Sequence, residues 1–117
     1  MKPTFYIAID FDGTLTKPSF PDTGKPNVNN INKIYNYIKR KENEGYRVVT
    51  ILWTCREDIP NDRPYLSEAI DWCDRILPFK LNYINENPEQ TFGHKELVRK
   101  IIADVYIDDM SINPIYL

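Results

Sequence analysis

Two kinds of pattern alternate along the chain, and this alternation restricts the fold more than any other feature. Short runs of β-branched and aromatic residues are nearly continuous in apolar character, as in strands that are buried on both faces. Between these runs, apolar residues recur at helical spacing. The patterns predict strands at residues 4–9, 46–52, 81–84 and 104–107.

Three helices are expected between these strands. The first carries apolar residues from Val28 to Ile38 at helical spacing, and Gly45 follows where a helix is expected to stop. The second has an apolar face from Leu66 to Leu77, with Pro64 near its first turn, where a missing N–H group is tolerated. A third, shorter helix is expected at residues 95–102.

The resulting β-α-β-α-β-α-β order favours a parallel sheet covered by helices and connected by right-handed crossovers. Because the chain has 117 residues, of which 42% are apolar, it can bury one hydrophobic core but hardly two. We therefore expect a single domain spanning residues 1–117. Ligands in such sheets bind beyond the carboxyl ends of the strands, which makes that rim the place to look for a site.

Composition argues against several classes of partner. The formal net charge of -2 provides no bulk attraction to nucleic acid or to anionic membranes. No apolar run approaches the length of a membrane span, and the first residues lack a signal-peptide pattern, so a cytoplasmic location is expected. Cys55 and Cys73 have no metal-ligand spacing, which favours ordinary reduced thiols.

Acidic residues follow the first and last predicted strands. Asp10 and Asp12 come after the first strand, Asp108 and Asp109 after the last, and Thr54 lies just beyond the second. Crowded carboxylates repel one another unless a cation is bound, and oxygen ligands without histidine or cysteine favour Mg²⁺. Because aspartate is also common in turns, each acidic pair taken alone has a simpler explanation.

Three segments resemble signatures of the haloacid dehalogenase-like (HAD) hydrolase superfamily. They are "DFDGTLT" at 10–16, "VVTILWTCRE" at 48–57 and "KIIADVYIDD" at 100–109, and together with the strand "YIAI" they span nearly the whole chain. The resemblance implies a three-layer, Rossmann-like α/β fold with helices on both faces of a parallel sheet. The first strand would lie centrally, between those that precede Thr54 and Asp108. The short intervals between the signatures imply an enzyme without a cap domain.

The same resemblance implies a magnesium-dependent phosphatase. Asp10 would be the nucleophile that forms an aspartyl-phosphate, and Asp12 would act first as general acid and then as general base. Mg²⁺ would be held by Asp10, the backbone carbonyl of Asp12, Asp108 and, directly or through water, Asp109. Thr54, a lysine and the backbone N–H groups near Phe11 and Asp12 would bind the phosphoryl oxygens of a small phosphorylated substrate.

The identity of the lysine is open between Lys100, favoured by its place in "KIIAD", and Lys95. Cys55 and Arg56 follow Thr54 directly, so both are candidate substrate contacts. Arg56 would supply a second cation for phosphate or substrate, or would simply be a solvated loop arginine.

Competing functions fit the sequence less well. A cysteine phosphatase in general needs its cysteine and arginine separated by five residues, but position 61 is Asn and Arg63 lies too far from Cys55. A receiver domain carries its phosphorylated aspartate after the third strand, and "LNYIN" provides none. A non-catalytic module that binds a metal or a phosphorylated ligand remains the alternative.

Without a cap, some other surface has to exclude water from the site. Candidates are the Pro-rich loop at 17–30, the loop at 85–93 and a second subunit contacting residues 112–117. A homo-oligomer is therefore one expected possibility.

Overall fold

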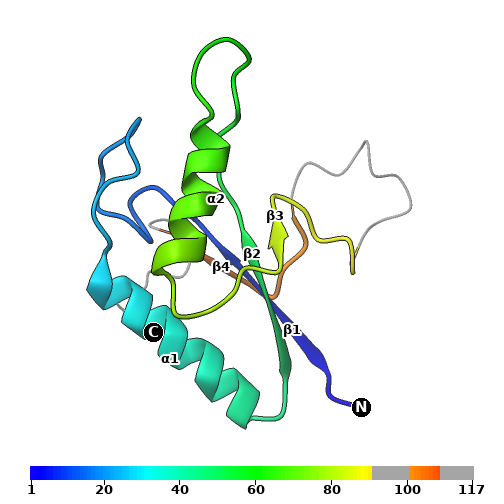
Figure 1. Ribbon diagram of the computed structural model, residues 1–117. Helices are drawn as coiled ribbons and strands as arrows, with labels where there is room; N and C mark the ends of the chain where they lie inside the picture. The colour runs from blue at the N-terminus through cyan, green and yellow to red at the C-terminus, as the bar shows by residue number, and fades with distance from the viewer. Residues whose placement is uncertain (91–100, 109–117) are drawn as a thin grey trace.

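The computed structural model describes residues 1–90 and 101–108, which form a parallel four-stranded sheet with two helices packed against it (Figure 1). The strands are β1 (Thr4–Ile9), β2 (Arg47–Leu52), β3 (Tyr83–Ile84) and β4 (Val105–Ile107). Their order across the sheet is β3-β2-β1-β4. This is a Rossmann-like α/β fold, and the predicted central position of the first strand is confirmed.

The strand register aligns the carboxyl ends that were expected to carry the site. β1 pairs with β2 from Thr4↔Arg47 to Ile9↔Leu52, and Ile9 also pairs with Ile107 of β4. All these pairings are parallel, so the residues that follow β1, β2 and β4 emerge at the same edge of the sheet.

Both described helices, α1 (Val28–Asn43) and α2 (Tyr65–Ile76), lie on one side of the strands (Figure 1). The Asn27 side chain caps α1 by accepting a hydrogen bond from the N–H of Asn30 at 3.2 Å. Gly45, at φ +99°, follows its end, as predicted. Right-handed crossovers explain the shared face, because the chain moves in one direction from β1 through β2 to β3.

The two faces of the sheet have separate apolar clusters. On the helical side, Ile7 and Ile9 of β1 pack with side chains from both helices. On the opposite side, Tyr6, Val49 and Ile51 pack with Ile101. The crossover from β3 to β4 runs in the reverse direction, so a helix within it would cover this second face. Most of the third helix predicted at 95–102 lies outside the described residues, and residues 101 and 102 are not helical.

β3 is shorter than the strand predicted at 81–84 because side chains take up part of its first main-chain pairing, in which the Asn82 N–H still donates to the Thr50 carbonyl at 2.8 Å. The Asn82 side-chain oxygen accepts the Thr50 N–H at 2.9 Å, and the Thr50 hydroxyl donates to the Lys80 carbonyl. Regular pairing with β2 therefore starts only at Tyr83.

Among the described helices, neither has the length and apolar character needed to cross a membrane.

Candidate functional site

Asp10 and Asp108 lie at the carboxyl ends of neighbouring strands. The Asp10 N–H donates to the Ile107 carbonyl at 3.0 Å, which continues the β1–β4 ladder by one residue and fixes the backbone of Asp10 beside the end of β4. The Thr14 hydroxyl makes a long, 3.5 Å contact with the Asp10 carboxylate. Both aspartates are only partly exposed, so the fold brings two of the predicted carboxylate residues to one rim.

The chain turns sharply after Asp10. The Phe11 carbonyl accepts the N–H groups of Thr14, Leu15 and Thr16 at 3.0–3.3 Å, and Gly13 takes φ +81°, a conformation that favours glycine. The side chains of Thr14 and Leu15 are fully buried, so the turn is anchored in the core. Within residues 1–90 and 101–108, the N–H groups of Phe11, Asp12 and Gly13 have no hydrogen-bond acceptor. Such a turn can present N–H groups to an anion.

Thr54 is held at the end of β2 by Asn85, a residue that sequence reasoning did not single out. The Thr54 N–H donates to the Asn85 side-chain oxygen at 2.8 Å, and the Thr54 hydroxyl accepts the N–H of Arg56 at 3.2 Å. Asn85 adopts φ +52° directly after β3, a conformation that asparagine tolerates better than most residues. Its place at a strand end was the signal that could have identified it.

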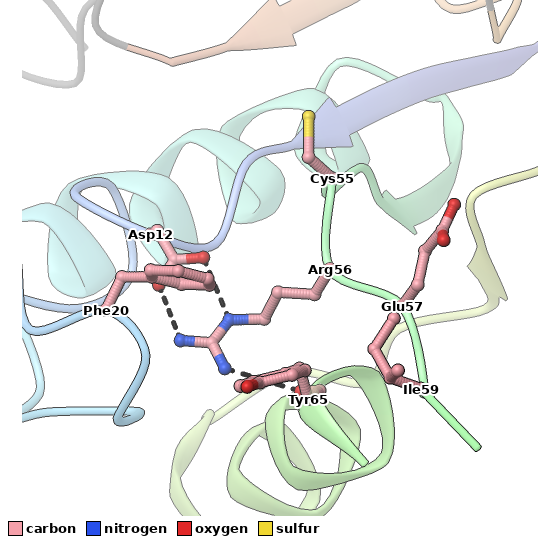
Figure 2. Close-up of a pocket in the computed structure, with 7 residues that line it drawn as sticks. All are labelled: Asp12, Phe20, Cys55, Arg56, Glu57, Ile59 and Tyr65. Atoms are coloured by element: carbon pink, nitrogen blue, oxygen red, sulfur yellow. Dashed lines mark hydrogen bonds and ion pairs between the residues drawn. The ribbon is translucent and has the colours of Figure 1, made fainter. Parts of the chain in front are cut away.

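Asp12 and Arg56 form a two-pronged ion pair (Figure 2). The Arg56 Nε and Nη2 atoms donate to the two Asp12 carboxylate oxygens at 2.9 and 2.8 Å. The Arg56 side chain is only 1% exposed and that of Asp12 is 29% exposed. Burial therefore excludes the interpretation of Arg56 as a solvated loop arginine.

Arg56 also donates to three backbone carbonyls, which belong to two segments of the chain. Its Nη2 donates to the Asp22 carbonyl at 2.9 Å, and its Nη1 donates to the carbonyls of Pro21 at 3.1 Å and Tyr65 at 3.4 Å. The guanidinium lies 5.1 Å from the ring centroid of Phe11 and the same distance from that of Phe20. Each of its nitrogens thus already has an acceptor in the protein, which leaves little capacity to bind phosphate directly.

A pocket of 340 Å³ opens beside this ion pair. Figure 2 shows its lining side chains, which come from the turn after β1, the loop that leads on to α1, the loop after β2 and the start of α2. They are Asp12, Phe20, Cys55, Arg56, Glu57, Ile59 and Tyr65. Cys55 and Arg56, both predicted substrate contacts, therefore do line one cavity, together with Asp12.

The two loops expected to cover the site behave differently. The loop between β1 and α1 reaches the pocket through Phe20, whose ring stacks on Tyr65 at 5.9 Å. After Asn85, in contrast, the chain returns toward the start of β2, where Glu89 accepts two hydrogen bonds from Arg47 at 2.7 and 2.8 Å. The contact of Glu89 with Arg47 thus holds residues 86–90 near the start of β2, away from the carboxyl ends of the strands.

The Glu89 carboxyl group is strongly perturbed by its hydrogen bonds. Hydrogen bonds from Arg47 and then from Tyr83 lower its pKa from 4.5 to about 2. The Tyr83 hydroxyl donates to Glu89 at 2.7 Å and the Tyr6 hydroxyl at 3.2 Å, so this one carboxylate joins β1, β2 and β3.

The Cys73 thiol lies in the core. Burial raises its pKa to about 12, as expected of an unreactive core cysteine.

Several predicted site residues fall in the parts of the chain that the structure does not describe. Lys95, Lys100 and Asp109 lie outside the described residues, as does the C-terminal segment 112–117. Among the residues that the structure describes, no three His, Cys, Asp or Glu side chains are grouped closely enough to hold a metal ion. Asp10 and Asp108 nevertheless provide the oxygen donors that suit Mg²⁺, on adjacent strand ends.

Comparisons with known proteins support the fold and leave the activity open. No protein-family model and no curated protein matches the sequence. The chain is similar to a solved structure described as a conserved protein from Bacteroides thetaiotaomicron, with 28% sequence identity and a TM-score of 0.64. The alignment covers 93% of this chain and 78% of the other.

Proposed function

We propose that the protein is a magnesium-dependent phosphomonoester hydrolase that works through an aspartyl-phosphate on Asp10. The observation that supports this most directly is the arrangement at the rim, where Asp10 adjoins both the end of β4 and a turn whose N–H groups at 11–13 have no acceptor among residues 1–90 and 101–108. A nucleophilic carboxylate, a second carboxylate and donors for phosphoryl oxygens are the groups that such a reaction needs.

Each step can be assigned to residues of this chain. One Asp10 carboxylate oxygen attacks phosphorus, and the bond between phosphorus and the leaving oxygen breaks as that oxygen takes a proton from Asp12. Asp12 then removes a proton from water, which attacks phosphorus and breaks its bond to Asp10. The Thr54 hydroxyl and the N–H groups of the turn would hold the remaining phosphoryl oxygens.

A bound Mg²⁺ would reduce the repulsion between the substrate's phosphate and the carboxylates. Asp10 and Asp108 would hold it through carboxylate oxygens, and the backbone carbonyl of Asp12 is a further candidate ligand. Asp109 and the phosphate lysine, Lys100 or Lys95, belong to the same proposal.

The Asp12–Arg56 pair imposes one condition on this mechanism. Both Asp12 oxygens accept hydrogen bonds from Arg56, so one of them has to be released before Asp12 can carry a proton to the leaving group. Movement of the Asp12 side chain alone would suffice, because its 29% exposure leaves a free side, whereas Arg56 is fixed by three carbonyl groups.

Asp10→Asn tests the nucleophile. The amide has nearly the same volume but cannot attack phosphorus, so we expect phosphate release from an aryl phosphate in the presence of Mg²⁺ to fall at least a thousandfold while the circular dichroism spectrum is unchanged. Asp71→Asn, on the exposed side of α2, is the matched control and should keep full activity. Wild-type turnover by Asp10→Asn would rule out this nucleophile.

A non-catalytic module that binds a metal or a phosphorylated ligand is the second candidate. The observation in its favour is the Asp12–Arg56 pair, in which both oxygens of the proposed acid accept hydrogen bonds from Arg56. Asp12→Asn separates the two functions. An enzyme should accumulate phosphorylated Asp10 in this variant, since the second step lacks its base, whereas a binding module should never become phosphorylated.

A further inference from the structure

The pocket beside Asp12 has the chemistry of a binding site for a flat, uncharged and largely apolar group. Its apolar wall consists of Phe20, Ile59 and Tyr65. Phe20 is 65% exposed and Ile59 41% exposed, so large apolar side chains face solvent at the mouth of a cavity whose volume suits a small molecule. The stacked rings of Phe20 and Tyr65 provide flat surfaces.

The polar groups of the pocket argue against a strongly hydrophilic occupant. Arg56 offers no free donor to a sugar or a second phosphate, because every one of its nitrogens is already hydrogen-bonded to Asp12 or to a backbone carbonyl. Glu57 adds a carboxylate to the lining and would repel an anionic occupant. An uncharged ring system avoids both penalties.

We propose that this pocket receives the leaving group of the substrate, and that the preferred substrates are aryl phosphates whose leaving group is a fused-ring alcohol without charge. The assignment to the leaving group rests on the proposed function, in which Asp12 protonates the leaving oxygen. Because Asp12 lies in the wall of the pocket, the group attached to that oxygen is the part of the substrate that enters it. Phe20, Ile59 and Tyr65 are then specificity-determining residues.

Two substrates of similar intrinsic reactivity measure this preference. Phenyl phosphate and 2-naphthyl phosphate release alcohols of similar acidity, but only the second fills a two-ring site. We expect the KM for 2-naphthyl phosphate to be about tenfold lower, because the additional ring is buried against apolar side chains. Ile59→Ala and Phe20→Leu should each reduce that ratio, and Val28→Ala, an exposed apolar residue outside the pocket, should leave it unchanged.

A binding measurement separates this inference from the phosphatase proposal. In titration calorimetry, 2-naphthol alone should bind to the wild-type protein and to Val28→Ala, and binding to Ile59→Ala should be at least threefold weaker. Absence of 2-naphthol binding, or equal KM values for the two esters, would overturn the pocket assignment even in an active phosphatase. Binding of 2-naphthol without hydrolysis of either ester would overturn the phosphatase proposal and, with it, the role of the pocket as a leaving-group site. The pocket would then be a site that binds flat rings without catalysis.

Discussion

At the scale of single residues, Arg56 shows how a loop side chain becomes part of the structure around a site. Its position two residues after Thr54 is uninformative by itself. In the fold, however, its guanidinium is buried near two aromatic rings and reaches Asp12 and three backbone carbonyls. Fork-shaped pairing of this kind is available to arginine and not to lysine.

Arg56→Lys should therefore destabilise the protein although the charge is kept. A single ammonium cannot replace the paired hydrogen bonds, so buried carbonyls and one Asp12 oxygen lose their donors. We expect the free energy of unfolding in urea to fall by about 2–4 kcal/mol. The matched variant Arg75→Lys alters an exposed pair with Asp71 on α2 and should change stability by less than about 0.5 kcal/mol. Equal effects of the two substitutions would contradict the structural role of Arg56.

Only those residues of the candidate site that directly follow a strand could be placed from the sequence. Asp10, Thr54 and Asp108 follow strands whose apolar runs are unmistakable, so the topology alone gathers them at one rim. The Asp12–Arg56 pair and the contact between Asn85 and Thr54 depend instead on how loops fold in three dimensions. The spacing of apolar residues along the sequence does not predict which loop residues contact one another.

At the scale of elements, the loop between β1 and α1 depends on Gly24. Gly24 adopts φ +80°, and a Cβ atom there would lie 2.7 Å from the Cβ of Ser19, closer than real Cβ atoms approach. Its carbonyl also accepts a hydrogen bond from Trp72 on α2 at 3.3 Å. Close packing at Gly24 thus helps to set the path of the segment that carries Phe20 to the pocket.

Gly24→Ala and Gly45→Ala form a matched pair that isolates this packing. Both glycines have positive φ values, so alanine is strained at each by about 1–2 kcal/mol. Gly45 has no neighbouring atom within 4 Å of an added Cβ, whereas Gly24 has three. We expect the larger loss of unfolding free energy for Gly24→Ala. Equal losses would indicate that the loop relaxes without cost.

Glu89 makes stability depend on pH. Because its pKa is lowered from 4.5 to about 2 by Arg47 and Tyr83, folding favours the ionised form. This contribution is complete above about pH 4.5 and is lost as the pH falls toward 2. In urea titrations across this range, Glu89→Gln should flatten the acid loss of stability, and Glu86→Gln, outside the Arg47 contact, should not. An unchanged profile in Glu89→Gln would contradict the shifted pKa.

The elements themselves were largely predictable from sequence. The strand expected at 4–9 agrees with β1, and the one expected at 46–52 differs from β2 only by Tyr46. These central strands are buried on both faces, which produces a strong apolar signal. The predicted length of β3 was too great because the Thr50 N–H donates to the Asn82 side chain instead of a strand carbonyl, an arrangement that apolar periodicity does not detect.

At the scale of the whole molecule, a metal that binds only the folded chain should stabilise it. If Mg²⁺ binds between Asp10 and Asp108, a concentration one hundred times the dissociation constant adds about 2.7 kcal/mol and raises the melting temperature by several degrees. Asp108→Asn should remove this shift, and Asp62→Asn, in the exposed loop after β2, should keep it. An identical melting temperature after exhaustive chelation would argue against the site.

The same metal should govern activity. Phosphate release is expected to require Mg²⁺, to be supported by Mn²⁺ and to be suppressed by Ca²⁺, whose longer and looser coordination would misplace the nucleophile. Full turnover after chelation would contradict this dependence.

The central position of β1 has a consequence for how the protein is made. β1 is synthesised long before its partner β4, and the Tyr6 N–H donates to the Asp104 carboxylate across 98 positions. During translation, β1 can pair with β2 early, but one of its edges stays open until residues 104–108 leave the ribosome. Asp10 and Asp108 thus meet only after residues 104–108 have been made, so the rim is completed later than the packing of α1 and α2 on β1 and β2.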